Sequence, residues 1–203
     1  PFDKIIFDVG HQAYAHKIIT GRAAEFSTIR QYGGLSGFPS RTESAEYDIF
    51  TTGHSSNAVS LALGLACGRD LLPAREHFKV AAVIGDGSLS GGLCFEGLNN
   101  AGHLKKDILV VLNTNELSIA PNVGALSNYL NKIISLPVYN HFRESLVNFL
   151  SSRGARGERL LRLANKFEEG LKGLFVPGVL FEELGFRYFG PLDGHNIDLL
   201  VHS

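Results

Sequence analysis

Three short apolar runs along the chain show no alternation with polar residues, a pattern that is typical of parallel strands buried on both faces. They occupy residues 5–7, 80–84 and 108–112 and consist of Ile, Val, Leu, Ala and Phe. The segment 89–104, between the second and third runs, is long enough for a crossover helix. The pattern therefore predicts an α/β fold with a mostly parallel sheet flanked by helices.

The rest of the chain alternates between helical stretches and loops. Residues 20–48 are rich in Gly, Ser and charge, which suits either a long loop over an active-site mouth or a surface excursion. Helices are predicted after residue 57 up to Cys67, up to Ile134, and over 140–151, 158–174 and 181–184. A short strand at 186–189 and a turn at 193–196 that opens a last helix complete the prediction.

Two polar residues follow the second and third apolar runs. Asp86 lies within Gly85-Asp86-Gly87, and Asn115 ends Asn113-Thr114-Asn115. Because ligands bind beyond the carboxyl ends of parallel strands, we expect the two side chains to converge. Their oxygens suit magnesium or calcium better than zinc, and magnesium usually keeps phosphate oxygens or waters in its shell. A pyrophosphate bridged by magnesium fits this pair, although Gly-Asp-Gly alone is an ordinary turn.

Two further turns carry histidines close to predicted strand or helix ends. His11 follows the first strand, and His54 lies in Gly53-His54-Ser55-Ser56-Asn57, whose Ser and Asn residues are natural caps for the next helix. A lone histidine is more often structural than functional. Two histidines that each follow a Gly at a predicted ligand-facing turn favour a binding role, either as phosphate donors or as proton carriers.

Composition narrows the classes of function. The chain has 203 residues, 44% of them hydrophobic, which supports one α/β domain with a sizeable core. Its 19 basic and 20 acidic residues nearly balance, so we expect no nucleic-acid partner. No apolar run approaches the roughly 20 residues of a membrane helix, so we expect no membrane partner. Cys67 and Cys94 lie in apolar helical contexts and are expected to be buried free thiols.

The chain has no Met and begins at Pro1, almost directly before the first strand. We therefore expect it to be an internal piece of a longer protein, in which any targeting segment lies outside these residues.

Several motifs along nearly the whole chain resemble the 1-deoxy-D-xylulose-5-phosphate synthase family of transketolase-like, thiamine-diphosphate-dependent enzymes. The Gly-Asp-Gly and Asn pair indicates the cofactor class, and the histidine-containing blocks distinguish this family from ordinary transketolases and pyruvate dehydrogenases. The blocks are Asp8-Val9-Gly10-His11-Gln12-Ala13-Tyr14, Gly34-Leu35-Ser36-Gly37-Phe38-Pro39, Gly53-His54-Ser55-Ser56, Asn115-Glu116-Leu117-Ser118-Ile119 and Gly190-Pro191-Leu192-Asp193-Gly194-His195.

The resemblance implies that residues 1–203 are part of a thiamine-diphosphate-binding domain of transketolase-like fold, on its diphosphate-binding side. It implies a magnesium ion held by Asp86, Asn115 and the backbone carbonyl of Leu117. Its implied thiamine diphosphate contacts are His11, Gly53, His54, Ser55, Asp86, Gly87, Ser88 and Asn115.

The implied reaction condenses pyruvate with glyceraldehyde 3-phosphate, releases carbon dioxide and yields 1-deoxy-D-xylulose 5-phosphate, a precursor of isoprenoids, thiamine and pyridoxal. The family further implies a homodimer in the bacterial cytoplasm, with a plastid as the other location. The acidic residue that activates the cofactor is expected in a following domain. The catalytic residues are therefore not assigned, and residues 1–203 alone are expected to be inactive.

One residue departs from the family pattern at the metal site. The family usually has Asp between the two asparagines, where this chain has Thr114. Because neighbouring strand-end residues point oppositely, we expect Thr114 to face away from Asn113 and Asn115 and metal binding to survive. The alternatives are another transketolase-type thiamine-diphosphate enzyme and a non-catalytic scaffold that only binds the cofactor.

Overall fold

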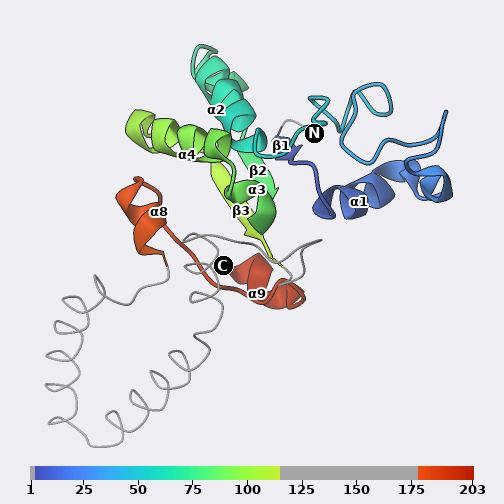
Figure 1. Ribbon diagram of the computed structural model, residues 1–203. Coiled ribbons are helices and arrows are strands. Elements are labelled where there is room, and N and C mark those ends of the chain that lie inside the picture. Colours follow the sequence, from blue (N-terminus) through green and yellow to red (C-terminus); the bar gives the residue numbers. More distant parts are fainter. Residues whose placement is uncertain (1–2, 115–177) are drawn as a thin grey trace, which may run out of the picture. The chain divides into compact units, whose positions relative to one another are not determined.

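The computed structural model describes residues 3–114 and 178–203 (Figure 1). The chain divides into two units, Pro1–Asn122 and Val123–Ser203, and each is described by itself. Asn115, Leu117 and the helices predicted up to Ile134 and over 140–151 and 158–174 lie outside the described residues.

Within residues 3–114, the first unit is built on a parallel sheet of three strands. The strands are β1 (Lys4–Phe7), β2 (Val80–Gly85) and β3 (Leu109–Asn113), in the order β1-β2-β3. The register pairs Phe7 with Val83 and Val83 with Val111, so the three strands end at the same edge. The predicted parallel sheet is confirmed, and each strand end lies within one residue of the predicted position.

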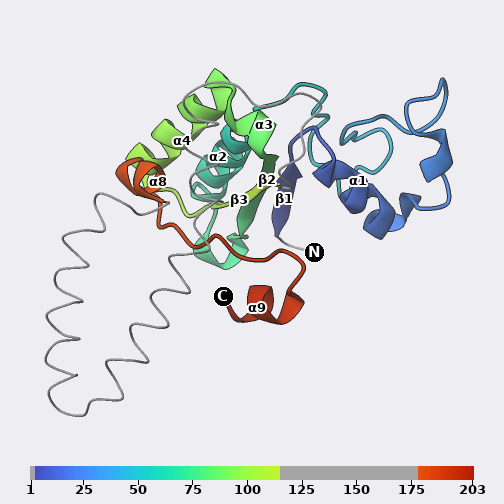
Figure 2. The same ribbon diagram turned by 60° about the horizontal axis from the view of Figure 1, so that its bottom comes forward.

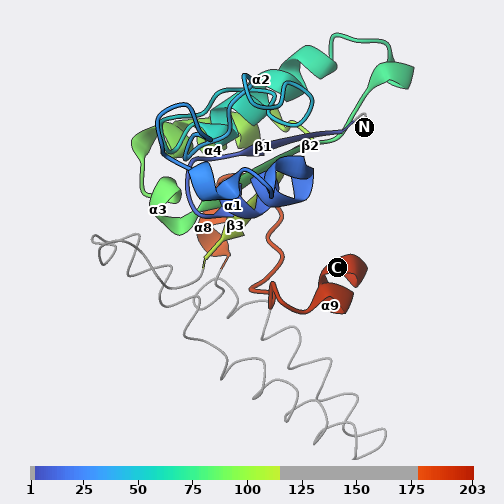
Figure 3. The same cartoon turned by 90° about the vertical axis from the view of Figure 1, so that its right-hand side faces the viewer.

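Two helices cover one face of this sheet. They are α2 (Ala58–Arg69) and α4 (Gly92–Leu104), which lie side by side in all three ribbon views (Figures 1, 2 and 3). Gly97 permits the close approach, because a Cβ there would lie only 3.1 Å from Val59 Cγ1. The strand residues beneath the helices, Val80, Ala82 and Ile84, are at most 2% exposed. This side of the sheet is the core of the unit.

The opposite face of the sheet is more open than the sequence predicts. Ile5, Leu109 and Val111 point to this face and are 48%, 60% and 40% exposed. The expectation of strands buried on both faces is therefore wrong for this face within residues 3–114. An apolar run predicts burial, but it cannot show which part of the chain supplies the cover.

The segment between β1 and α2 forms a layered loop held by charged side chains. It begins with α1 (Gln12–Lys17), a kinked turn at Ile18–Arg22 (η1) and one 3-10 turn, Phe26–Thr28 (η2). His16 Nε2 lies 2.7 Å from Asp48 Oδ1, and Arg22 donates to both oxygens of Asp48. Lys17, which has no exposed surface, pairs with Glu43. These ion pairs tie α1 and η1 to residues 43–48.

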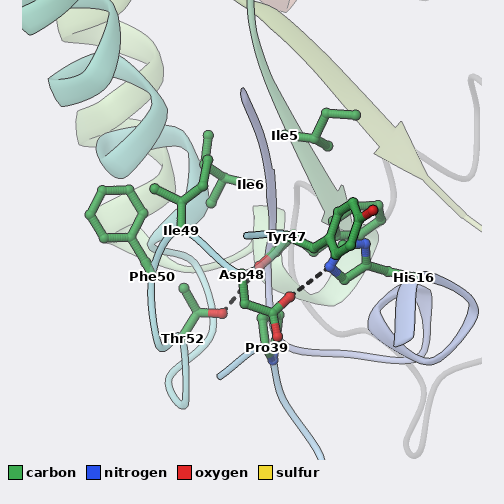
Figure 4. Close-up of a pocket in the computed structure, with 10 residues that line it drawn as sticks. Ile5, Ile6, His16, Pro39, Tyr47, Asp48, Ile49, Phe50 and Thr52 are labelled. Atoms are coloured by element: carbon green, nitrogen blue, oxygen red, sulfur yellow. Dashed lines mark hydrogen bonds and ion pairs between the residues drawn. The ribbon is translucent and has the colours of Figure 1, made fainter. Parts of the chain in front are cut away.

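The same segment lines a small pocket against β1. Figure 4 shows His16 and Asp48 pointing toward each other there, beside Tyr47 and Pro39. The Thr52 hydroxyl donates to the Phe7 carbonyl at 3.2 Å, which fixes the chain just before Gly53. The predicted long loop is thus present, and two of its charged residues, Arg22 and Asp48, are buried. Its other charged side chains are partly buried at Glu43 and exposed at Glu25, Arg30, Arg41 and Glu46.

Two short elements complete the described part of the first unit. A 3-10 turn, Ala74–Glu76 (η3), links α2 to β2, and α3 (Asp86–Leu89) begins directly after β2 (Figure 2). Within the part of the chain that the structure describes, no helix is both long and apolar enough to span a membrane.

The described part of the second unit contains two short helices, α8 (Val179–Glu183) and α9 (Ile197–His202). They match the helices predicted near 181–184 and after 193–196. The strand predicted at 186–189 is wrong, because these residues form no ladder within 178–203. Aromatic and alternating residues there satisfy a strand pattern, but Tyr188 instead stacks on Phe181 with ring centroids 5.8 Å apart.

Candidate cofactor site

The carboxyl edge of the sheet gathers three polar residues, one after each strand: Asp8 after β1, Asp86 after β2 and Thr114 after β3. Asp86 is half-buried, and its Oδ1 accepts the Gly87 amide at 2.8 Å. The carboxylate is therefore oriented by its own turn at the edge where a ligand of a parallel sheet binds.

Thr114 reaches the other oxygen of this carboxylate. Its hydroxyl donates to Asp86 Oδ2 across a long 3.4 Å contact. The alternation of side chains along a strand predicts that Thr114 faces away from Asn113 and Asn115. It makes no prediction about contacts with the neighbouring strand, such as this one with Asp86. The residue that departs from the family pattern thus lies beside the proposed metal ligand.

Asp8 is a site residue that the sequence analysis does not assign. It is completely buried, and its two oxygens accept the backbone amides of Ser56 at 3.1 Å and Ala58 at 3.2 Å. It also hydrogen-bonds the Ser88 side chain. Burial raises the pKa of the Asp8 carboxyl, and these hydrogen bonds oppose the rise. The available signal was a carboxylate directly after a buried strand, the same signal that identifies Asp86.

Asp8 also replaces the predicted cap of α2. Asn57 occupies the position before the helix, but its side chain makes no capping hydrogen bond, and its Oδ1 is buried without a partner. The expectation that Ser and Asn side chains cap this helix is therefore wrong. The carboxylate of Asp8, directly after β1, instead accepts the amide of Ala58, the first residue of the helix, and its charge suits the helix N-terminus.

The His54 turn is held against the Gly-Asp-Gly segment from a second side. Ser56 has a φ of 75°, a left-handed conformation that is uncommon for a residue with a side chain. Its side chain packs onto Gly91, where a Cβ would lie only 2.6 Å from Ser56 Cβ. Together with the link from Asp8 to Ser88, this packing joins residues 53–57 to residues 86–91.

The His11 turn meets the same edge through Gln12. The Gln12 side chain donates to the Asp8 carbonyl at 3.0 Å, and a Cβ on Gly85 would lie 3.6 Å from its Oε1. The end of β1 and the end of β2 are therefore in contact through this side chain. The structure brings the His11, His54 and Asp86 segments to one edge of the sheet.

Exposure differs among the residues proposed to bind the cofactor. His11, Gly53, His54, Ser55 and Gly87 are exposed at this edge, as a ligand surface requires. Ser88 is only 6% exposed. Within residues 3–114 and 178–203, no three His, Cys, Asp or Glu side chains gather to hold a metal ion.

The two cysteines differ in exposure. Both are free thiols, as predicted; Cys94 is buried and Cys67 is only half-buried. Burial raises the pKa of the Cys94 thiol to about 12.

Comparison with known proteins gives a consistent result along the whole chain. A family model described as 1-deoxy-D-xylulose-5-phosphate synthase matches residues 1–203. The protein of that name from Alkaliphilus oremlandii is 58% identical over 196 residues, which cover 97% of this chain and 31% of the relative. The one from Syntrophus aciditrophicus is 56% identical over 203 residues, 100% of this chain and 31% of the relative. The chain thus spans about 31% of the length of these curated relatives.

The chain is also similar to a solved structure. The transketolase from Leishmania mexicana is 28% identical, with a TM-score of 0.47, over 58% of this chain and 20% of that protein.

Proposed function

The chain belongs to the 1-deoxy-D-xylulose-5-phosphate synthase family, and from this premise we propose that it forms the diphosphate-binding part of such a transferase. The complete protein would condense pyruvate with glyceraldehyde 3-phosphate, using thiamine diphosphate and Mg²⁺. The observation that carries the proposal is the joining of the His11, His54 and Asp86 segments at the carboxyl edge of the sheet.

The donor set in the described residues fits a magnesium-bridged diphosphate. Asp86 offers a hard oxygen, which Mg²⁺ prefers, at a position already oriented by the Gly87 amide. Asn115 and the Leu117 carbonyl would complete the protein ligands, and both lie outside the described residues. Few protein ligands suffice for Mg²⁺, because phosphate oxygens and waters fill the rest of its shell.

The exposed turn residues would hold the phosphate groups. His11 and His54 can each donate an N–H to a phosphate oxygen, and Ser55 can donate its hydroxyl. Gly53 and Gly87 leave room for close approach of a ligand to the backbone. Ser88 is different, because its side chain is buried against Asp8, so its contribution would come from its backbone.

The bound cofactor would supply the carbanion chemistry. The protein would position the cofactor and balance the negative charge of its diphosphate. Within this chain, the turns would fix the phosphate end and thereby orient the reactive ring. Because the family resemblance implies that the group activating the cofactor belongs to a following domain, we propose that residues 1–203 alone do not turn over substrate. Carbon dioxide released from pyruvate by the isolated segment would contradict this.

The test is a calorimetric titration of the full-length protein with thiamine diphosphate, with and without Mg²⁺. We expect magnesium-dependent binding that Asp86→Ala abolishes. Asp107→Asn is the control, because Asp107 is an exposed carboxylate that pairs with Lys79. Both residues precede the strands β2 and β3, at the edge of the sheet opposite to Asp86. Equal binding by the wild type and Asp86→Ala would refute the proposed metal role. A steady-state assay that offers pyruvate against a ketose phosphate separates this activity from that of other transketolase-type enzymes.

A further inference from the structure

Asp8 is completely buried, and it hydrogen-bonds both the turn that carries His54 and the side chain of Ser88, which follows Gly87. Its Oδ1 accepts the Ser56 amide at 3.1 Å, and its Oδ2 accepts the Ala58 amide at 3.2 Å. We infer that Asp8 is a positioning residue that holds the turn carrying Gly53, His54 and Ser55 in its binding conformation before a cofactor arrives. The inference rests on the proposed function, because that turn is the proposed diphosphate contact.

The conformation of the turn requires such support. Ser56 has a φ of 75°, and a residue with a side chain keeps this conformation only where its surroundings enforce it. The carboxylate fixes the Ser56 amide from one side, and Gly91 leaves space for the Ser56 side chain on the other. Hydrogen bonds to a charged acceptor are stronger than neutral ones, so a carboxylate holds the turn better than an amide would.

The arrangement divides the turn into an occupied and an available half. The amides of Ser56 and Ala58, at the start of α2, are already bonded to Asp8. A phosphate therefore meets only the exposed half, Gly53–Ser55. Because the protein itself orders this half, less conformational entropy is lost when the cofactor binds.

A purely structural role for Asp8 makes a different prediction. If Asp8 only capped α2, its loss would reduce the amount of folded enzyme and leave the affinity of the remaining molecules unchanged. If Asp8 positions the turn, its loss raises the KM for the cofactor, and saturating cofactor restores kcat. The two roles are separated by which parameter changes: kcat per total enzyme falls in the first case, and KM rises in the second.

The variant for this test is Asp8→Asn in the full-length protein. Asparagine has one acceptor oxygen, so one of the two amides must face an NH₂ group and lose its partner. Loss of one of the two hydrogen bonds loosens the turn, so we expect the KM for magnesium thiamine diphosphate to rise on the order of tenfold. The control is Asp3→Asn, because Asp3 accepts the Lys79 amide at 2.8 Å before the start of β1. The control should leave KM unchanged.

The outcomes separate the inference from the proposed function. If the wild type shows no magnesium-dependent binding of thiamine diphosphate, the proposed function itself fails. If the wild type binds and Asp8→Asn has the wild-type KM, the positioning role alone is overturned.

A second measurement needs no variant and covers the case in which Asp8→Asn does not fold. Hydrogen–deuterium exchange of the cofactor-free, full-length wild type should show protected amides at Ser56 and Ala58 and faster exchange at His54 and Ser55. Adding magnesium thiamine diphosphate should then protect His54 and Ser55. If Ser56 and Ala58 become protected only when the cofactor is added, the cofactor organises the turn and the inference is wrong.

Discussion

The substitution Gly91→Ala tests the joined turns with a single methyl group. Gly91 has φ −78° and ψ 137°, which alanine adopts freely, so any effect comes from the space that the methyl occupies. The new Cβ would lie 2.1 Å from Ser56 Oγ and 2.6 Å from Ser56 Cβ. The hydroxyl can rotate away, but Ser56 Cβ moves only with the backbone.

The required displacement follows from these distances. Ordinary contact begins at 3.4 Å, against 2.6 Å between the two Cβ atoms, so they must separate by about 0.8 Å. Overpacking of this kind costs about 1–3 kcal/mol. The Ser56 amide is bonded to Asp8, so the shift also strains the turn that carries His54 and Ser55. Because sub-ångström placement matters in such sites, we expect the affinity for magnesium thiamine diphosphate to fall about tenfold.

Gly92→Ala is the matched control one residue further along. A Cβ there meets nothing within 4 Å, and the position lies in the first turn of α4. Calorimetry of both full-length variants measures cofactor affinity, and thermal unfolding measures stability. The control should bind like the wild type and be no less stable. The reasoning is refuted if Gly91→Ala also matches the wild type in both measurements.

Further predictions address the buried charges, the free thiol and the edge hydroxyl. Asp48→Asn removes the carboxylate that His16 and Arg22 share and should lower the free energy of unfolding by about 3–5 kcal/mol, visible as a lower melting temperature. Asp107→Asn, which breaks an exposed pair, should lower it by less than about 1 kcal/mol. Hydrogen bonds from His16 and Arg22 outweigh the burial of Asp48 and hold its pKa below the usual 3.8, so the stability that it contributes is present above that pH and is lost on acidification. The melting temperature of the wild type should therefore decrease as the pH is lowered from about 4, and the decrease should be shallower for Asp48→Asn. Cys94, with a pKa of about 12, should resist iodoacetamide at pH 8 in the native protein, and labelling at the rate of an unfolded thiol would contradict its burial. Thr114→Val should weaken magnesium binding several-fold and Thr114→Ser should not, as read by a magnesium titration in calorimetry; equal affinity in both variants would exclude a role for the hydroxyl.

The sheet was predictable because local patterns determine it. Runs such as Val80 to Ile84 are too apolar for a loop and too short for a helix, and the crossover rule then makes the strands parallel. The position of Asp86 follows directly, since it comes immediately after a strand. Family motifs along the chain added the cofactor expectation, which local patterns alone leave at a magnesium-bound phosphate.

The features that the sequence does not predict depend on contacts between distant parts of the chain. Asp8 lies 48 residues before Ser56, and nothing near either residue in the sequence indicates their hydrogen bond. The same limit explains why Asn57 was predicted as the helix cap, since local propensity favours it and a distant carboxylate replaces it. A strand at 186–189 failed for a related reason, because a strand pattern forms a ladder only where a partner strand lies beside it.

The burial of Lys17 and Arg22 shows the same effect for charge. A Gly-rich, charged stretch is usually solvated, yet both side chains are buried here because Glu43 and Asp48 pair with them. The pairing links the helix after His11 to the chain that leads into Gly53. The loop composition was therefore predictable, but its role in supporting the two histidine turns was not.

The central claim is that this chain binds the phosphate end of thiamine diphosphate through magnesium. The most direct measurement is calorimetry of the full-length protein with thiamine diphosphate, in the presence of Mg²⁺ and again with excess chelator. We predict saturable binding that requires Mg²⁺ and is lost in Asp86→Ala. Binding that is unchanged by the chelator, or no binding in the presence of Mg²⁺, would contradict the account.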